Sequence, residues 1–328
     1  MSAPQPLRRT FRTGPGDEAQ RLDRLVLRRL ADIPGLSRVR IQEWIEAGRV
    51  RIGGVAVTRS SVRPALGTEV EVLFPHARPH PPPAAQEIPL SILFEDDWLL
   101  ALDKPPGMVA HPTKGHADGT LVNALLFYLG KAKGGAGLVN RLDKGTSGVL
   151  LVAKAPDVHA RLARVLATRE AEKEYLAAVY GPVRFPKGRI DRRILRAPSD
   201  PGRRMTSRTE GKDAATLWER LAETGGDDGG IALLRCRLLT GRTHQIRVHL
   251  QAEGMPIVGD PLYGEPCWKG LRDPALAAAC RDFPRQALHA RRLRFPHPVT
   301  REPVDVVAPV PPDLAGLLAI AWHGHCFL

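Results

Sequence analysis

A proline-rich segment, HARPHPPPAAQEIP at residues 76–89, limits what this chain of 328 residues can fold into. Proline has no backbone N–H and a fixed φ, so a run of this density fits neither a helix nor a paired strand and forms a semi-rigid extended spacer. We therefore expect a domain boundary here, between a small domain at 19–75 and a larger one at 90–328. Residues 1–18 are rich in Arg, Pro and Gly without apolar periodicity, which predicts a mobile basic arm.

The charge of the chain indicates the class of its partner. The sequence has 48 Lys and Arg residues against 35 Asp and Glu, which gives a formal net charge of +13 and an isoelectric point near 10.1. Such an excess suits a polyanion, nucleic acid before a membrane. No apolar run approaches the roughly 18 residues that span a bilayer, and neither a signal peptide nor paired cysteines are evident. We expect a soluble, cytoplasmic, monomeric protein that binds nucleic acid without zinc or disulfides.

The pattern of the small domain predicts two helices followed by strands. A helix is expected at 19–31, where apolar residues recur at helical spacing, and Pro34-Gly35 ends it. Ser37 is a suitable N-cap for a second, basic helix. Residues 50–57 alternate around a Gly-Gly pair, the pattern of a β-hairpin, and a last strand is expected at 69–73.

This order of elements resembles the αL-type RNA-binding module first described in a ribosomal protein of the small subunit. The resemblance implies that the second helix and the hairpin lie against RNA phosphates, which adds affinity without reading bases. The residues expected on this face are Ser37, Arg38, Arg40, Gln42, Arg49 and Arg51. A solvated helix face with no role in binding is the alternative interpretation.

In the larger domain, the stretch NRLDKGTSGVLLVAK at 140–154 combines a polar turn with a buried strand. The continuous apolar run Val149–Val152 is typical of a strand covered on both faces. Asp143 lies in the turn between Arg141 and Lys144, whose charges favour its ionised form. An ionised carboxylate at the end of a rigid strand is well placed for catalysis, although an Asp that simply starts a turn is common.

Two further stretches place polar side chains together. In EKEYLAAVYG, strand alternation puts Lys173 and Tyr175 on one side. In TGRTHQIRVHL, a helix that starts near Thr243 puts His244 and Arg247 on one face. The remaining pattern predicts strands at 90–94, 98–102, 215–221, 231–238 and 291–295, helices at 121–129 and 157–169, and a basic, loop-rich stretch at 182–215.

Three stretches occur in order: DKPPGMVAHPTKGHADGT, RLDKGTSGVLLVAK followed by KEY, and TGRTHQIRVHLQAEGMPIVGDPLYG. Together they resemble the RluA family of RNA pseudouridine synthases, over roughly residues 90–305. The resemblance implies an α+β fold in which a mixed, largely antiparallel catalytic sheet carries flanking helices. It also implies isomerisation of selected uridines in RNA, with neither metal nor organic cofactor. In this reaction the glycosidic C–N bond breaks and a C–C bond forms.

The resemblance implies roles for residues of this chain. Asp143 corresponds to the catalytic aspartate, which either attacks C1′ of the ribose or removes a proton from C2′. Tyr175 corresponds to the residue that stacks on the flipped uracil and assists proton removal at C5, and Arg247 to the arginine that pairs with the aspartate. Arg141 corresponds to the side chain that fills the gap left by the flipped nucleotide, and Ile246 is expected to pack against the base. The expected substrate-binding residues are completed by Lys173, Arg242 and His244.

Asn140 departs from the family pattern, which has histidine at this position. An amide can replace one hydrogen bond of an imidazole but does not titrate near neutral pH. We take the role of this position as structural and the site as intact. His111, His244 and His289 are also expected to be structural rather than metal ligands, since no Cys or carboxylate lies at ligand spacing.

Large-subunit ribosomal RNA is the expected substrate. The same chemistry on transfer RNA is one alternative. A catalytically silent RNA-binding assembly factor, which uses only the basic surface, is the other.

Overall fold

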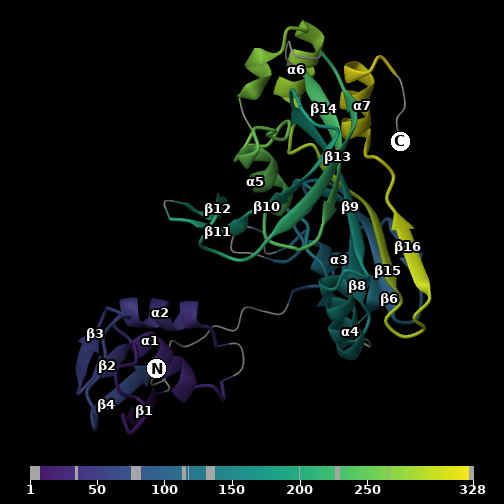
Figure 1. Cartoon of the computed structure of the whole chain (residues 1–328). Helices are drawn as coiled ribbons and strands as arrows, with labels where there is room; N and C mark the ends of the chain where they lie inside the picture. The colour runs from purple at the N-terminus through teal and green to yellow at the C-terminus, as the bar shows by residue number, and fades with distance from the viewer. Residues whose placement is uncertain are drawn as a thin grey trace. The chain divides into compact units, whose positions relative to one another are not determined.

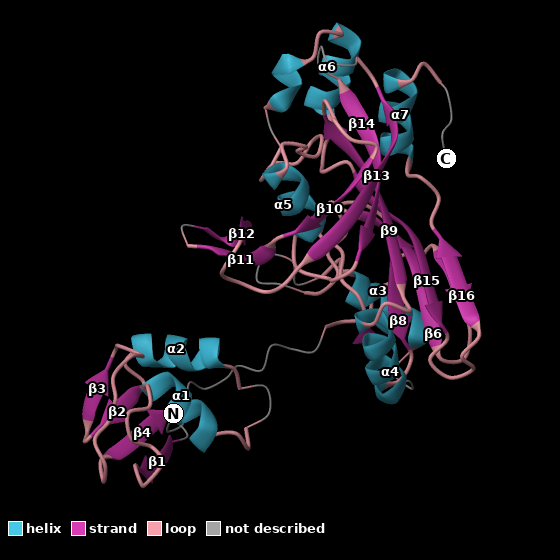
Figure 2. Ribbon diagram, viewed as in Figure 1, coloured by secondary structure: helices cyan, strands magenta, loops and turns pink. Residues whose placement is uncertain are grey.

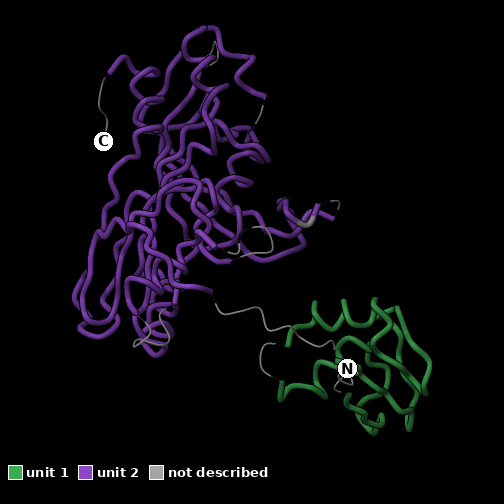
Figure 3. Tube along the Cα trace, turned by 180° about the vertical axis from the view of Figure 1, so that it is seen from behind, with its two compact units in different colours: residues 1–82 green, residues 83–328 purple. Residues whose placement is uncertain are grey.

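The structure is a computed structural model, and it describes residues 8–33, 36–74, 83–112, 116, 118–130, 137–198, 200–225, 230–264 and 266–324. The chain divides into two compact units, Met1–Pro82 and Pro83–Leu328, which Figure 3 colours separately. Residues 75–82, which include the first half of the proline-rich segment, lie outside the described residues. Each unit has its own apolar core and is described by itself.

The first unit has two helices packed on a four-stranded antiparallel sheet (Figure 1). Its elements are β1 (Arg8–Arg12), α1 (Leu22–Arg29), α2 (Arg38–Glu46), β2 (Val50–Ile52), β3 (Val55–Val57) and β4 (Glu69–Leu73), in the sheet order β1-β4-β2-β3. The Ser37 side chain accepts a hydrogen bond from Arg40 N, and both glycines of the hairpin turn have positive φ. The predicted helix cap and hairpin are therefore confirmed.

The first strand corrects the prediction of a mobile arm. Residues 8–12 pair with β4 in an antiparallel ladder. This pairing covers an edge of β4 whose N–H and C=O groups would otherwise lack partners, so a basic segment without apolar periodicity still becomes a strand. The first helix also begins later than expected, at Leu22, because Ala19 has a φ of 58° that a right-handed helix cannot contain.

The second unit is built on one large sheet (Figure 2). Its strands are β5 (Ile92–Glu95), β6 (Leu99–Lys104), β7 (Gly137–Leu138), β8 (Ser147–Ala153), β9 (Glu172–Tyr180), β10 (Lys187–Asp191), β13 (Ala215–Glu223), β14 (Ile231–Leu238), β15 (Leu288–Pro296) and β16 (Pro303–Val307). The order is β10-β13-β14-β9-β15-β8-β6-β5, with β16 on β15 and β7 on β8. Only β8 and β15 pair in parallel within this described sheet, which confirms the predicted mixed, largely antiparallel arrangement.

Helices cover both faces of this sheet: α3 (Leu121–Leu129), α4 (Pro156–Ala167), α5 (Gln245–Ala252), α6 (Pro274–Asp282) and α7 (Pro312–Ala321), with a 3-10 helix at Cys267–Gly270. At β8, Val149 and Leu151 lie in one apolar cluster with α4, whereas Leu150 and Val152 lie in another with α3. The strand is covered on both faces, as its continuous apolar run predicted. None of the helices in the described ranges has the length and apolarity that a bilayer crossing needs.

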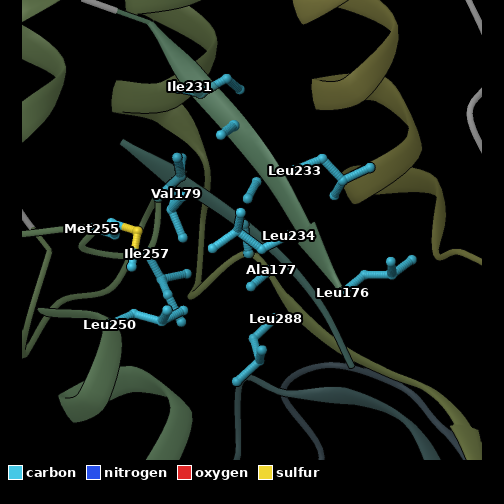
Figure 4. Packing of buried hydrophobic residues seen from close by; sticks show 14 of the residues in the cluster. Leu176, Ala177, Val179, Ile231, Leu233, Leu234, Leu250, Met255, Ile257 and Leu288 are labelled. Atoms are coloured by element: carbon cyan, nitrogen blue, oxygen red, sulfur yellow. The ribbon is translucent and has the colours of Figure 1, made fainter. Parts of the chain in front are cut away.

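A further apolar cluster supports the other half of the sheet. Figure 4 shows Val179 of β9 and Leu234 of β14 packed near Leu250 of α5 and Ile257. All four side chains are fully buried. Because interiors of this kind are close-packed, α5 is fixed against the sheet, and with it the site residues that the helix carries.

Several local predictions in the second unit are wrong. The stretch at 182–215 is not loop-rich but contains β10 and a separate antiparallel pair, β11 (Arg193–Ala197) with β12 (Asp200–Ser207). Charged residues along both strands hide this hairpin from a hydrophobic pattern. Helix α4 begins at Pro156 instead of being capped by Asp157, and α5 begins after His244, whose left-handed φ of 58° replaces the expected cap. The helices α6 and α7 were not predicted.

The described part of the proline-rich segment lies against α3. Asn123 Nδ2 donates to Ala84 O at 2.7 Å, and Gln86 N donates to Asn123 O at 3.0 Å. Asn123 also forms the capping box of α3 with Thr120. Residues 83–89 are therefore tied to the second unit and are not a free spacer.

Candidate active site

A cleft of about 1270 Å³ opens in the second unit, and it is bordered by the turn at 139–146, strand β9, the turn at 241–244 and the start of α5. The eight residues expected to act on a substrate all line it: Asp143, Tyr175, Arg247, Arg141, Lys173, Arg242, His244 and Ile246. Asp143 and Arg247 are 104 positions apart in the sequence and meet in this cleft because the large sheet brings their segments together.

Asp143 is paired with Arg247. Arg247 Nη1 donates to Asp143 Oδ2 at 2.8 Å, while its Nε and Nη2 donate to the two carboxylate oxygens of Asp260 at 2.7 and 2.8 Å. The Arg247 and Asp260 side chains are 5% and 0% exposed. The bidentate pair with Asp260 fixes the guanidinium plane, so the remaining Nη1 is directed at Asp143. Burial opposes the charge on Arg247, but the two carboxylates outweigh it and raise the pKa of the guanidinium.

The cations next to Asp143 in the sequence are not its partners. We expected Arg141 and Lys144 to flank the carboxylate. Within the described residues, however, its ion pair is with Arg247 at 2.8 Å, and His244 Nε2 lies 3.8 Å from its Oδ2. Neighbouring side chains in a turn diverge, whereas α5 and the residue before it face the carboxylate across the cleft.

Asp260 and Tyr263 extend this pair into a polar network that the sequence interpretation missed. Asp260 Oδ1 accepts hydrogen bonds from the backbone N–H of Leu262 and of Tyr263 at 3.0 and 3.2 Å. The Tyr263 ring centre lies 5.1 Å from the Arg247 guanidinium, and its hydroxyl lies 3.1 Å from His244 Nδ1. The available signal was an acidic residue in a glycine-containing turn, the same kind of feature that singled out Asp143.

Tyr175 and Ile246 give the cleft an apolar wall, with exposed fractions of only 9% and 3%. Burial, and then the negative charge of Asp143, raises the pKa of Tyr175, so the phenol keeps its proton. Lys173 lies on the same side of β9 as Tyr175, as predicted, and its Nζ donates to Leu166 O at 2.8 Å.

Lys104 anchors the turn that carries Asp143. Its Nζ donates to three carbonyl oxygens, those of Pro105, Met108 and Lys144, at 2.8, 3.1 and 3.2 Å. The residue is only 1% exposed, and burial together with the charge of Arg285 lowers the pKa of Lys104 to about 8. A cation buried this deeply is tolerated because its three donors are all used.

Asn140 binds the strand that follows the turn. Its Oδ1 accepts from Leu151 N at 2.7 Å, and its Nδ2 donates to Val149 O at 3.3 Å. Both bonds are to backbone groups of β8, so the side chain at this position has a structural role, as expected.

Arg285 and Gln286, just before β15, hold the same turn from another side. Arg285 Nε and Nη2 pair with Asp313 of α7 at 2.6 and 2.8 Å, and Nη1 donates to Gly145 O at 2.9 Å. Gln286 Nε2 donates to Thr146 Oγ1 at 3.0 Å. The sequence interpretation missed these residues, because Arg285 is 140 positions from Gly145 and no local pattern marks it.

Known proteins resemble this chain over most of its length. The family described as RNA pseudouridylate synthase matches residues 98–252. Ribosomal large subunit pseudouridine synthase D of Xanthomonas campestris pv. campestris is 45% identical, over 87% of this chain and 85% of that protein. The chain belongs to the RNA pseudouridine synthases. The Vibrio vulnificus protein of the same name is 40% identical, over 91% of this chain and 90% of its own.

Solved structures of RNA pseudouridine synthases share the fold. Human RNA pseudouridylate synthase domain containing 4 has a TM-score of 0.56 at 26% identity, with 70% of this chain and 92% of that chain covered. Human RNA pseudouridylate synthase domain containing 1 has a TM-score of 0.54 at 28% identity, covering 71% and 89%. Members of the family isomerise uridine to pseudouridine in RNA.

In the first unit of this pseudouridine synthase, two of the residues expected to bind RNA hold a buried aspartate. Arg38 Nε and Gln42 Nε2 each donate to Asp23 Oδ2 at 2.8 Å. Burial opposes ionisation of Asp23, but hydrogen bonds from Arg21, Arg38 and Gln42 lower its pKa to about 2. Arg38 and Gln42 therefore also stabilise the unit, since they neutralise a carboxylate in its interior.

The other residues expected to contact RNA differ in whether their side chains already have partners within the protein. Ser37 is the cap of α2, and Arg51 Nη1 lies 3.9 Å from Glu71. Arg40 and Arg49 are exposed, and no acidic side chain within the described residues pairs with either. These two arginines have the most unneutralised charge in the set.

The histidines considered as metal ligands lie in different surroundings. His289 Nδ1 lies 3.0 Å from Ser147 Oγ in the core, while His244 lines the cleft beside Asp143. In the part of the chain that the structure describes, no group of three or more His, Cys, Asp or Glu side chains could hold a metal ion.

Proposed function

We propose that this RNA pseudouridine synthase isomerises specific uridines of large-subunit ribosomal RNA. Its relatives named ribosomal large subunit pseudouridine synthase D match it at 45% and 40% identity, and its net charge of +13 suits a large RNA. The observation that carries the proposal is the 2.8 Å ion pair of Asp143 with Arg247, inside a cleft that also contains Tyr175 and Ile246.

In this proposal Asp143 acts at the ribose. Arg247 holds Oδ2 at 2.8 Å, and no donor among the described residues lies within hydrogen-bonding distance of Oδ1, which leaves that oxygen to the substrate. A carboxylate fixed in this way either attacks C1′ as a nucleophile or removes a proton from C2′. The charge-assisted bond from Arg247 keeps it oriented in both cases.

The uracil of a flipped nucleotide stacks on Tyr175 and packs against Ile246. Flipping the nucleotide out of the RNA costs about a few kcal/mol. Arg141 is exposed at the cleft, and it offsets part of this cost by filling the gap that the flipped nucleotide leaves in the RNA. Because burial keeps the Tyr175 phenol protonated, we assign its ring to stacking and not to proton removal at C5 as a phenolate. The remaining contacts to the substrate come from Lys173, Arg242 and His244.

The first unit binds structured RNA around the target in this proposal. The positive charge that attracts the RNA comes chiefly from Arg40 and Arg49. Supporting contacts to the RNA come from Ser37, Arg38, Gln42 and Arg51. The protein acts as a monomer in the cytoplasm, where bacterial ribosomal RNA is assembled. The mass of the protein–RNA complex, measured by analytical sedimentation, tests whether one protein chain binds each RNA.

Release of tritium from RNA labelled at C5 of uridine tests the substrate. Large-subunit ribosomal RNA and bulk transfer RNA are compared at equal concentration and salt, since affinity for both depends on ionic strength. We expect release from ribosomal RNA only. Release from transfer RNA alone would overturn the proposed substrate, and release from neither would leave the protein as a silent RNA binder.

A further inference from the structure

We propose that a second hollow beside the active cleft binds a backbone phosphodiester of the RNA next to the target nucleotide. The hollow has a volume of about 480 Å³ and lies between the β11–β12 hairpin and the turn at 241–243. Figure 2 shows this hairpin projecting from the body of the second unit. Gly241, Arg242 and Thr243 line both the hollow and the active cleft, so a strand leaving the cleft past this turn enters the hollow. The inference rests on the proposed function.

The charge of the hollow fits a phosphate. Four of its nine lining residues are cations, namely Arg196, Arg204, Lys212 and Arg242, and none is acidic. Arg196 and Lys212 are exposed, and neither pairs with an acidic side chain within the described residues. An isolated cluster of like charges is unfavourable unless an anion binds there.

The acidic partners of this region lie on other arginines. Arg193 Nε pairs with Asp213 Oδ1 at 2.9 Å, and Arg192 Nε pairs with Glu253 Oε1 at 2.9 Å. Asp213 offers Arg242 only its carbonyl oxygen, which accepts from Nε at 3.0 Å. The neighbouring acids therefore neutralise arginines outside the hollow, while Arg196 and Lys212 keep their charge for a ligand.

The floor of the hollow is rigid. Ile194 and Lys212 exchange two backbone hydrogen bonds of 2.9 Å, which fixes β11 against the chain that lines the other side. Gly211 lies within this contact, and a Cβ there would be 2.7 Å from Ile194 O. A preformed floor of this kind lowers the entropic cost of binding a ligand in the hollow.

The hairpin is also joined to the catalytic network. Arg204 N donates to the Tyr263 hydroxyl at 2.7 Å, the same hydroxyl that lies 3.1 Å from His244 Nδ1. The Tyr263 ring in turn contacts the guanidinium of Arg247. These contacts fix the distance between the hollow and the Asp143–Arg247 pair. A fixed distance is needed if the hollow is to bind one particular phosphate relative to the target nucleotide.

Binding measurements over a range of KCl concentrations test the proposal. Arg196→Gln and Lys212→Gln are each introduced into the full-length Asp143→Asn protein, so that the RNA is not converted. We expect each to weaken binding to a large-subunit ribosomal RNA fragment about five-fold at roughly 0.1 M salt and to lower the salt slope by about 0.7, the values for one lost phosphate contact. Arg208→Gln removes an exposed charge just after β12 that does not line the hollow, and we expect no change.

Neutral methylphosphonate linkages, placed one at a time around the target in a synthetic RNA, locate the contact. We expect a linkage beside the target to weaken binding to the parent protein, but not to weaken it further in the Arg196→Gln/Lys212→Gln double variant. Equal loss in both proteins would overturn the proposal. Unchanged RNA affinity in the double variant would also overturn the proposal. That result is expected if the hollow binds only free inorganic phosphate. A loss of affinity in that variant, with no tritium release by the wild type from ribosomal RNA, would overturn the proposed substrate alone.

Discussion

Asp143 and Asp260 share one arginine, and the two carboxylates have different surroundings. Asp260 is fully buried and takes two of the Arg247 donors, while Asp143 lines the open cleft and takes one. The buried carboxylate thus fixes the arginine, and the arginine fixes the carboxylate that we propose to react. At the scale of single residues, we propose that Asp260 is a positioning residue, since it does not line the cleft.

Arg247→Ala should therefore lower both turnover and stability. We expect kcat to fall on the order of 10²- to 10³-fold with little change in KM, because Asp143 loses its orienting partner. The free energy of unfolding should fall by about 3 kcal/mol, because Asp260 is left buried without a counter-charge. Tritium-release kinetics and urea unfolding measure the two effects.

Arg237→Ala is the matched control for Arg247→Ala. Arg237 pairs with Glu172 at 3.0 Å on the surface, with 45% of its side chain exposed. We expect near-normal turnover and a loss of less than about 1 kcal/mol. If Arg247→Ala behaved like this control, its pairing with Asp143 would have no part in the reaction.

Sequence reasoning found the residues in the family's motifs and missed those that hold them. Asp143, Tyr175 and Arg247 were singled out, and the structure brings them to one cleft. Arg285 was not, because its partner Gly145 lies far along the chain, and Asp260 was missed although its partner Arg247 is only 13 positions away. A charged residue whose partner is 140 positions away has no local signature.

At the scale of elements, the segment before β15 holds the turn before β8, and a glycine of this turn differs in its surroundings from a glycine at the start of β8. A Cβ on Gly145 would lie 2.5 Å from Gln286 Oε1, which is the end of a flexible side chain. A Cβ on Gly148 would lie 2.2 Å from the Ala290 carbonyl oxygen, and Gly148 has a φ of 106°. The first clash can be relieved, and the second cannot.

Gly145→Ala should displace Gln286 and lower kcat about ten-fold, with a loss of about 1 kcal/mol in stability. Adding Gln286→Ala should restore part of the turnover by making room for the new methyl group. Gly148→Ala should lose about 3 kcal/mol or more through backbone strain and overlap, and Gln286→Ala should not rescue it. Rescue of both glycine variants, or of neither, would contradict this account of the turn.

His289 lies where β15 pairs in parallel with β8, and it makes the stability of the fold depend on pH. Burial is the main cause that lowers the pKa of His289 to about 4, from an ordinary value of 6.5. Below pH 6.5 the unfolded chain binds this proton and the folded chain does not. The associated stability is therefore fully present above pH 6.5 and is lost as the pH falls toward 4, by up to about 3 kcal/mol.

His289→Asn removes that proton uptake while keeping a polar side chain beside Ser147. We expect the variant to be less stable at neutral pH and its stability to fall less steeply than that of the wild type between pH 6.5 and 4. Urea unfolding as a function of pH measures the difference. Parallel curves for the two proteins would exclude His289 as the cause.

Elements with a strong period or a clear cap were predictable. The helix at 121–129 and the strands at 69–73 and 231–238 match the structure residue for residue. The β11–β12 hairpin was not predictable from an apolar pattern, because arginines interrupt that pattern along both of its strands. The strand at 8–12 needed the edge of β4, a tertiary partner that no local pattern records.

At the scale of the whole molecule, the net charge of +13 predicted a polyanionic partner but not where it binds. Many arginines are neutralised by carboxylates, as Arg38 is by buried Asp23. The charge left for RNA is therefore concentrated at fewer places, among them Arg40 and Arg49 of the first unit and the hollow of the second.

Removal of residues 1–82 tests the contribution of the first unit. The remaining chain keeps the whole large sheet and the cleft. We expect weaker binding to structured ribosomal RNA and a salt slope lower by about 2, since contacts from Arg40, Arg49 and Arg51 are lost. Turnover of a short RNA around the target should change little. An unchanged salt slope would mean that the first unit does not bind RNA.

The central claim is that Asp143 performs the isomerisation, and Asp143→Asn tests it most directly. Tritium release from C5-labelled large-subunit ribosomal RNA is measured for the wild type, for Asp143→Asn and for Asp157→Asn, an exposed aspartate of α4 that serves as control. We predict that Asp143→Asn binds the RNA as the wild type does but releases tritium about 10³-fold more slowly or not at all, while the control is unchanged. Release by Asp143→Asn at the wild-type rate would contradict the account.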